Sequence, residues 1–354
     1  ESTALGPTMD RAEEVGKMTE KLFGKMPDGT PVEEYTLRDG ELSCGVITYG
    51  GALRSLVLPD RAGKPVDILL GFDTLEDYQR QDKYIGALIG RYANRIGGSR
   101  FVLEGQEYRL AANESPNHLH GGVTGFDKQV WGVESALENT LTLTLQSPDG
   151  QEGYPGNLEV TVTYTLGDSA LSIDYRAVSD RTTLCNLTNH AYWNLSGHNS
   201  GDIREQQFRL PNSRYTPVDA GAIPTGTIDP VEGTPMDLRQ LQALGKREYD
   251  HNWAIDNWDG TLRLAAQAFS PGTGIDMEVL TTLPGIQFYT GNFLDGCPKG
   301  KGGAVYPRHG AFCLETQYYP NSPNIPDFPS AVLPAGEVWR SKTVYRFGKR
   351  DHHD

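Results

Sequence analysis

The segment from residue 185 to 197, CNLTNHAYWNLSG, combines side chains that a purely structural strand would avoid. Three amides, Asn186, Asn189 and Asn194, lie close to His190, and Trp193 lies among them. A strand that only has to pack favours valine, isoleucine and leucine at such positions. We therefore expect a polar ligand to lie against this segment.

Four other segments have the same character, because each places a charged or imidazole side chain among aromatic, amide or glycine residues. They read GRYANRIGG (90–98), NHLHGG (117–122), YDHNWAID (249–256) and FCLETQYYPNSPN (312–324). Taken singly, each also has a structural explanation. These explanations are a surface ion pair for Arg95, a glycine-supported turn for His118 and His120, a turn or cap for Asp250, and an exposed strand face for Glu315.

Glu315 has the strongest case for a function. It lies in the strand-like run AFCLETQYY, where strand parity places it on one face with Cys313 and Ala311. A carboxylate on such a face needs a partner or a chemical task, because burying an unpaired charge is costly.

Three histidines raise a metal site as an alternative. His118 and His120 form an H-x-H pair, to which His190 would add a distant third ligand. The amides and aromatics beside His190 are more typical of hydroxyl recognition than of the groups that orient metal-bound histidines. We therefore predict no metal site.

Five aromatic residues in these segments and in the run 285–292 are core candidates by default. Interleaved with amides and carboxylates, they also match a sugar site, where rings cover the apolar sugar face and planar polar groups hold the hydroxyls. They are Tyr192, Trp193, Trp253, Tyr289 and Tyr318.

The elements that would position these residues are mostly strands. Residues 141–147 and 158–166 alternate apolar with polar side chains, which indicates strands with one solvated face. Helix-like patterns are short and confined to 9–24, 75–80 and 236–244. Since no strand alternates with a long helix and no glycine-rich nucleotide motif follows a strand, we predict an all-β fold, a large antiparallel β-sandwich.

The domain organisation follows from the even composition of the chain. Residues 27–348 contain no linker-like segment, so we expect a single catalytic domain there. Residues 1–26 are expected to be an N-terminal extension, either with a short helix or as a mobile segment, and 349–354 a tail.

The chain is acidic, with a formal net charge of -14 over 354 residues. It has no extended basic cluster, so we expect no nucleic-acid partner. No apolar run approaches the roughly 20 residues that span a bilayer, so we expect no membrane partner. The four scattered cysteines, Cys44, Cys185, Cys297 and Cys313, are expected to be free thiols. We expect a cytoplasmic protein, with a secreted or periplasmic one as the alternative because the chain lacks an initiator methionine.

Six motifs together make the sequence resemble the aldose 1-epimerases, or galactose mutarotases. GRYANRI, HLHGG, TNHAYWNL, DHNW, GIQFYTGN and ETQYYPNSPN occur in the family's order over roughly residues 35 to 347. The resemblance implies an enzyme that interconverts the α and β anomers of free aldohexoses such as galactose and glucose. It implies no cofactor, and we expect a monomer or a homodimer.

The resemblance also implies roles for individual residues. It makes His190 the general acid and Glu315 the general base. The substrate-binding residues it implies are Asn94, Arg95, His120, Tyr192, Asp250 and Gln287. In this interpretation the amides and aromatics near His190 fix the sugar and the acid while displacing water.

Three alternatives remain open. A glycoside hydrolase would use Asp250 and Glu315 as its carboxylate pair, but it has no general need for His190. A non-catalytic sugar-binding sandwich would keep the aromatics and amides without using an acid and a base. An epimerase acting on a hexose phosphate would need a basic cradle, of which only Arg95 is evident.

Overall fold

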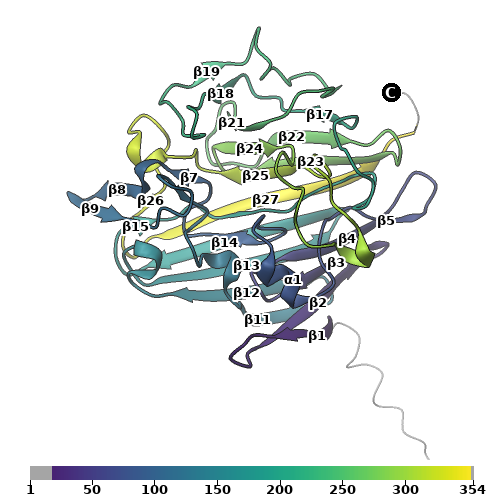
Figure 1. Cartoon of the computed structure of the whole chain (residues 1–354), viewed down its shortest axis with the longest axis horizontal. Coiled ribbons are helices and arrows are strands. Elements are labelled where there is room, and N and C mark those ends of the chain that lie inside the picture. The colour runs from purple at the N-terminus through teal and green to yellow at the C-terminus, as the bar shows by residue number, and fades with distance from the viewer. Residues whose placement is uncertain (1–17, 352–354) are drawn as a thin grey trace, which may run out of the picture.

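The structure is a computed structural model that describes residues 18–351. It confirms the predicted fold class, because nearly all regular elements are antiparallel β-strands. Three large sheets and four two-stranded ones account for the strands in this part of the chain (Figure 1).

The largest sheet has nine strands and contains both strand segments predicted from the sequence. In β13 the apolar side chains from Leu158 to Leu166 point inward and the intervening threonines outward, which is the alternation that the sequence shows. In spatial order the strands are β11 (Gly132–Leu137), β12 (Thr140–Ser147), β13 (Leu158–Gly167), β14 (Ala170–Ser179), β27 (Val338–Lys349), β23 (Ile275–Thr281), β22 (Arg263–Phe269), β17 (Gln207–Arg209) and β20 (Gln242–Ala243).

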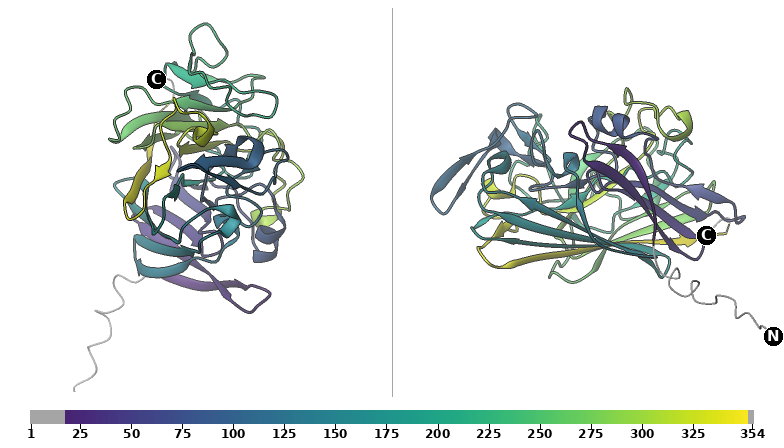
Figure 2. Two further views of the ribbon diagram at one scale, coloured as in Figure 1. Left: turned by 90° about the vertical axis from the view of Figure 1, so that its left-hand side faces the viewer. Right: turned by 90° about the horizontal axis from the view of Figure 1, so that it is seen from below.

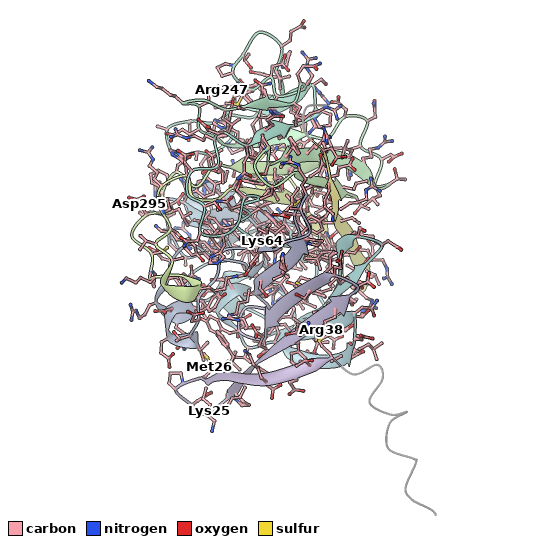
Figure 3. The ribbon with its side chains drawn as sticks, turned by 90° about the vertical axis from the view of Figure 1, so that its right-hand side faces the viewer. Lys25, Met26, Arg38, Lys64, Arg247 and Asp295 are labelled. Carbon is pink, nitrogen blue, oxygen red and sulfur yellow. The ribbon has the colours of Figure 1, made fainter. Side chains whose placement is uncertain are left out.

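Two five-stranded sheets lie toward opposite ends of the molecule. The first sheet consists of β1 (Thr19–Lys25), β2 (Pro31–Asp39), β3 (Leu42–Ile47), β4 (Leu53–Pro59) and β5 (Pro65–Asp67). The second consists of β19 (Asp229–Pro230), β18 (Arg214–Thr216), β21 (Asp250–Ala254), β24 (Gly285–Tyr289) and β25 (Cys313–Gln317). Figure 3 shows Lys25, the last residue of β1 in the first sheet, at one end and Arg247, just before β21 of the second sheet, at the other.

Four short strand pairs fill the space beside these sheets. They are β6 (Leu88–Ile89) with β16 (Thr188–Asn189), β7 (Arg95–Ile96) with β10 (His118–Leu119), β8 (Arg100–Leu103) with β9 (Gln106–Arg109), and β15 (Thr183–Leu184) with β26 (Val332–Leu333). Strands β16, β7 and β10 belong to three of the five segments that the sequence analysis singled out, and β21 and β25 belong to the other two.

The main core lies between the nine-stranded sheet and the other two large sheets. Figure 2 shows the long strands of the nine-stranded sheet as one curved layer, with strands of the other sheets packed beside it. The apolar cluster in this space takes side chains from all three sheets, among them Val46, Val162, Phe288 and Tyr345. Trp193 is fully buried in it, 4.9 Å from the Tyr345 ring centroid.

The one α-helix of the described residues, α1 (Leu75–Arg80), confirms the helix predicted at 75–80. Thr74 caps it by accepting a hydrogen bond from the amide of Asp77, and the buried Leu75 and Tyr78 anchor it. Five single 3₁₀ turns complete the helical elements of this part of the chain: Gly97–Ser99, Phe126–Lys128, Gln151–Gly153, Lys301–Gly303 and Ser322–Asn324.

The helix predicted at 236–244 is wrong, since this segment forms turns and the short strand β20. Two of its backbone carbonyls accept hydrogen bonds from distant groups, and it lacks the regular hydrogen bonds of a helix. The Trp253 indole donates to the carbonyl of Met236, and the Leu210 amide donates to that of Leu238. Tertiary contacts therefore override the helical spacing of the apolar residues.

The predicted N-terminal helix at 9–24 is wrong where the structure describes it, and residues 9–17 lie outside the described part. Thr19–Lys25 is strand β1, which pairs antiparallel with β2 and so belongs to the first sheet. Phe23 packs against Tyr78, with ring centroids 6.0 Å apart, and the Arg54 guanidinium lies over its ring. The first sheet thus begins before the predicted domain start at residue 27.

The four cysteines are free, as predicted; Cys44, Cys185 and Cys313 are buried and Cys297 is half-buried. Among residues 18–351, no helix has both the length and the apolar character needed to cross a membrane.

Replacing Phe23 tests whether β1 is an integral part of the fold. We expect Phe23→Ala to lower the free energy of unfolding by about 1.5–2.5 kcal/mol, roughly half the cost for a fully buried phenylalanine, because Phe23 is half-buried. Leu22→Ala is the control, with a side chain that is 59% exposed, and should cost less than about 0.5 kcal/mol. Urea unfolding measures both, and equal small effects would contradict a structural role for β1.

Candidate active site

One pocket of about 200 Å³ collects most of the predicted site residues. Seven of the eight lie on its wall, although they come from distant parts of the sequence. They are Asn94, Arg95, His120, His190, Tyr192, Asp250 and Glu315. A larger hollow of about 400 Å³ opens on the outer face of the nine-stranded sheet, but no predicted site residue lines it.

Short strands deliver these side chains to the pocket. His190 directly follows β16, His120 directly follows β10, and Arg95 begins β7. Glu315 lies in the middle of β25, and Asp250 begins β21, two strands away in the same sheet. The motifs meet because strand pairing brings them together, not because they are close in sequence.

His190 and Glu315 form the buried centre of the site. The Nε2 atom of His190 lies 3.4 Å from Oε1 of Glu315, and the two residues are 5% and 2% exposed. Within the described chain, that Oε1 atom has no hydrogen-bond partner. It is a buried polar atom next to the His190 ring and open to the pocket, which is unusual for a group with a structural role alone.

Burial lowers the pKa of His190 and raises the pKa of Glu315. It lowers the pKa of His190 to about 4, because the imidazolium loses hydration. Burial also raises the pKa of Glu315 well above its usual range; Asp250 adds to this shift and Arg95 opposes it. Each group therefore favours its uncharged form, and the carboxyl group keeps its proton to a higher pH than a free one would.

His120 is held in one tautomer. Its Nδ1 atom accepts a hydrogen bond of 2.9 Å from the backbone amide of Asn94, so the proton of the neutral ring lies on Nε2. Burial, assisted by His190 and Arg95, lowers the pKa of His120 well below its usual value. A neutral ring with an N–H on Nε2 can donate a hydrogen bond to a hydroxyl or ring oxygen.

The cationic side chain of Arg95 is oriented by neighbours. Its guanidinium forms a two-pronged ion pair with Glu114, and its backbone amide donates to the side chain of Asn94. Asn94 itself adopts a left-handed backbone conformation, with φ of 63°. Asparagine tolerates this conformation better than most residues, which explains its place before Arg95.

Gln287 is the eighth predicted residue, and it lies behind the pocket wall. Its Nε2 atom donates to Oδ1 of Asp250 at 2.9 Å, and its Oε1 atom accepts from Gln317 at 3.0 Å. The strand register places Gln287 directly between Asn252 and Glu315. Gln287 therefore orients Asp250 and is not among the residues that line the pocket.

The amides of the 185–197 segment do not face the pocket, so the expectation that they hold the ligand is wrong. Asn186 bonds to the backbone of Tyr318, Asn189 to the backbone of Gly86, and Asn194 to the backbone of Gly310. They join separate chain segments behind His190, because buried loops need side chains to satisfy their backbone groups.

The aromatic residues divide between pocket and core. Tyr192 and Tyr289 line the pocket, and the Tyr192 ring lies 5.1 Å from the His190 ring. Trp193 and Trp253 are fully buried in the main core, and Tyr318 packs on its edge. His118, the first histidine of the metal alternative, bonds to Ala111 and Tyr154 and does not line the pocket.

Several pocket residues were missed from the sequence. Glu114 lies just before the predicted 117–122 segment, and its pairing with Arg95 could be inferred only from the fold. Tyr84 lies in a loop that shows no periodic or motif signal. The remaining ones are Asp82, Lys83, Leu119 and Phe293.

The fold and the site, a polar pocket with buried ionisable groups, define an enzyme of a small polar substrate, and comparisons with known proteins give the class. A family model described as aldose 1-epimerase matches residues 33–346. A galactose mutarotase from Rattus norvegicus is 45% identical over 338 residues, covering 93% of this chain and 98% of that protein. An aldose 1-epimerase from Escherichia coli (strain K12) is 36% identical over 336 residues, covering 91% and 96%.

Solved structures give the same result. The crystal structure of an aldose epimerase homologue from C. elegans matches with a TM-score of 0.85 and 28% identity, covering 95% of this chain and 100% of that one. The chain belongs to the aldose 1-epimerase family. It is an isomerase that interconverts the anomers of sugars.

The pH dependence of activity tests the shifted pKa values of the pair. Below a pH of about 4 both groups are protonated and the base is lost, since the lowered pKa of His190 sets this limit. At high pH Glu315 also loses its proton and the acid is lost; its raised pKa sets that limit. We expect a bell-shaped profile of kcat/KM with its acid limb near pH 4. An acid limb near the usual histidine value of about 6.5 would contradict the burial argument.

Proposed function

We propose that the enzyme acts on free galactose and glucose, with His190 as the general acid and Glu315 as the general base. The observation that carries this assignment is the buried Glu315 Oε1 atom, which lacks a hydrogen-bond partner in the described chain and lies 3.4 Å from His190 Nε2. The names of the relatives at 44–46% identity, all galactose mutarotases, support galactose as a substrate.

The two groups are close enough to act on the two oxygens that C1 of a sugar ring carries. Glu315 removes the proton of the O1 hydroxyl while His190 protonates the ring oxygen. The bond between C1 and the ring oxygen breaks, and its electrons stay on that oxygen as C1 and O1 form a carbonyl. After rotation about the C1–C2 bond, the same groups act in reverse and close the other anomer. The protein ends with its original protons.

The single proton of the pair suits this reaction. Sugar binding places the O1 hydroxyl against the carboxylate and the ring oxygen against Nε2, which favours the charged arrangement of Glu315 and His190. The proton then lies on the acid before the ring opens. Each positioned group contributes roughly 10²–10⁴-fold to the rate.

The other predicted residues hold the sugar. Asp250 offers a hydrogen-bond acceptor to its hydroxyls, and Arg95 and His120 offer donors. Asn94 holds Arg95 and His120 in place through its hydrogen bonds to both residues. Tyr192 supports His190 from the pocket wall. Gln287 acts on the sugar through Asp250, whose carboxylate it orients.

The charges of the pocket favour a free sugar over a hexose phosphate. Its two cationic side chains are already paired, Arg95 with Glu114 and Lys83 with Asp82. Asp250 and Glu315 add two further carboxyl groups to the wall. A phosphate group would find no unpaired cation among these residues.

Polarimetry tests the activity and its independence of metal. Fresh α-D-galactose and α-D-glucose should equilibrate faster with the protein, and equally fast in excess EDTA, because the proposed acid and base are side chains. Loss of the rate on chelation, with recovery on adding zinc, would contradict the proposal.

Substitutions separate chemistry from binding. Glu315→Gln keeps the shape but removes the base, so kcat should fall by roughly 10²-fold or more with KM little changed. His190→Asn should lower kcat by a similar factor. The double variant should have a kcat close to that of either single variant, because the two groups act as a unit. Asp250→Asn is the comparison: because Asp250 is proposed to bind the sugar, KM should rise more than kcat falls. A normal kcat in Glu315→Gln would reject the assignment.

A further inference from the structure

Tyr84 lies in a loop that is tied to the backbone of His190. The loop runs between α1 and β6, where the Gly86 amide donates to the His190 carbonyl at 3.0 Å and the His190 amide donates to the Ala87 carbonyl at 2.8 Å. Any displacement of this loop therefore moves His190 as well.

Tyr84 adopts a backbone conformation that tyrosine disfavours. Its φ of 61° is in the left-handed region, where bulky side chains are rare. Two side chains hold the loop in place: Gln81 accepts from the amides of Lys83 and Ile85, and the Tyr192 hydroxyl donates to the Lys83 carbonyl. Such retained strain is concentrated at functional sites.

The Tyr84 ring contacts both imidazoles of the active site. It meets His120 edge-on, with ring centroids 4.7 Å apart, and lies nearly parallel to His190, with centroids 5.8 Å apart. The two imidazoles are themselves 5.1 Å apart, in an edge-on arrangement. One ring thus touches both histidines whose proton states matter for the reaction.

The same ring forms a wall between two cavities. It lines the active-site pocket and a neighbouring polar cavity of about 80 Å³, into which Asp127 and Lys128 project. The Nζ atom of Lys128 lies 5.3 Å from the Tyr84 ring centroid. Asp127 is 6% exposed, and its Oδ1 atom has no hydrogen-bond partner in the described chain. Removing the ring would join a charged cavity to the imidazoles.

We propose that Tyr84 is a positioning residue, whose ring keeps His120 and His190 dry and fixed against each other. This inference rests on the proposed function, because it assigns Tyr84 a task for the imidazoles used there. It concerns the ring and not the hydroxyl, which forms no hydrogen bond with another described residue.

Burial accounts for the low pKa of both imidazoles, so water admitted by loss of the ring should raise these values. The remaining ionisable neighbours stay in place in a Tyr84 variant. They are Glu315, Cys313 and Tyr192 beside His190, and Arg95, His118 and Lys128 beside His120.

The test compares Tyr84→Leu, which removes the ring but fills much of its volume, with Tyr84→Phe, which keeps it. Tyr108→Leu is the matched control, because Tyr108 is also half-buried and stacks on an aromatic ring, that of Phe101, outside the pocket. NMR titration of the histidine rings and the pH profile of kcat/KM are measured for all three. Thermal unfolding confirms that each variant folds.

We expect Tyr84→Leu to raise the pKa of His190 by about one unit and to move the acid limb of the profile with it, while kcat falls about 10-fold. Tyr84→Phe and Tyr108→Leu should resemble the wild type. Unchanged histidine titrations in Tyr84→Leu, or an equal effect in Tyr84→Phe, would overturn the proposal. The NMR shift does not depend on turnover, so it distinguishes this failure from a wrong assignment of acid and base.

Discussion

The burial of two ionisable groups side by side is the constraint on which the site depends. His190 and Glu315 are almost inaccessible to solvent, 3.4 Å apart, and each disfavours its charge. Neither could be buried alone as an ion without a large cost, but together they can share one proton and remain neutral as a pair. A substrate that supplies both a hydroxyl proton and an acceptor oxygen can then turn this neutral pair into an acid and a base.

The rest of the fold holds these two side chains at a fixed distance and keeps them buried. The sheet that contains β21, β24 and β25 fixes Glu315 relative to Asp250, with Gln287 as the link between the strands. The buried amides of the 185–197 segment fix His190 from behind by bonding to backbone groups. The polar residues around the site thus divide into those that face the pocket and those that hold the loops, and both kinds keep His190 and Glu315 at a fixed distance.

The sequence alone predicts the fold class and most of the pocket. Alternation in strands such as β13 is a local property, and six ordered motifs are specific enough to place His190 and Glu315 in one site. Roles that depend on which way a side chain points were not predictable. Asn189 faces the backbone of Gly86 instead of the sugar, and Gln287 faces Asp250. Tyr84 was missed because its contacts come from a loop without any pattern, and β1 because its spacing fits a helix equally well.

The central claim is that the pair retains one proton at neutral pH, and neutron diffraction from crystals at pH 7 tests it most directly. The account predicts one hydrogen more than an ionised carboxylate and a neutral imidazole carry together, mainly on a carboxyl oxygen of Glu315 and otherwise as a second ring N–H on His190. Ordinary pKa values would instead give an ionised carboxylate beside a neutral imidazole. A carboxylate without hydrogen beside an imidazole that carries hydrogen on only one ring nitrogen would contradict the account.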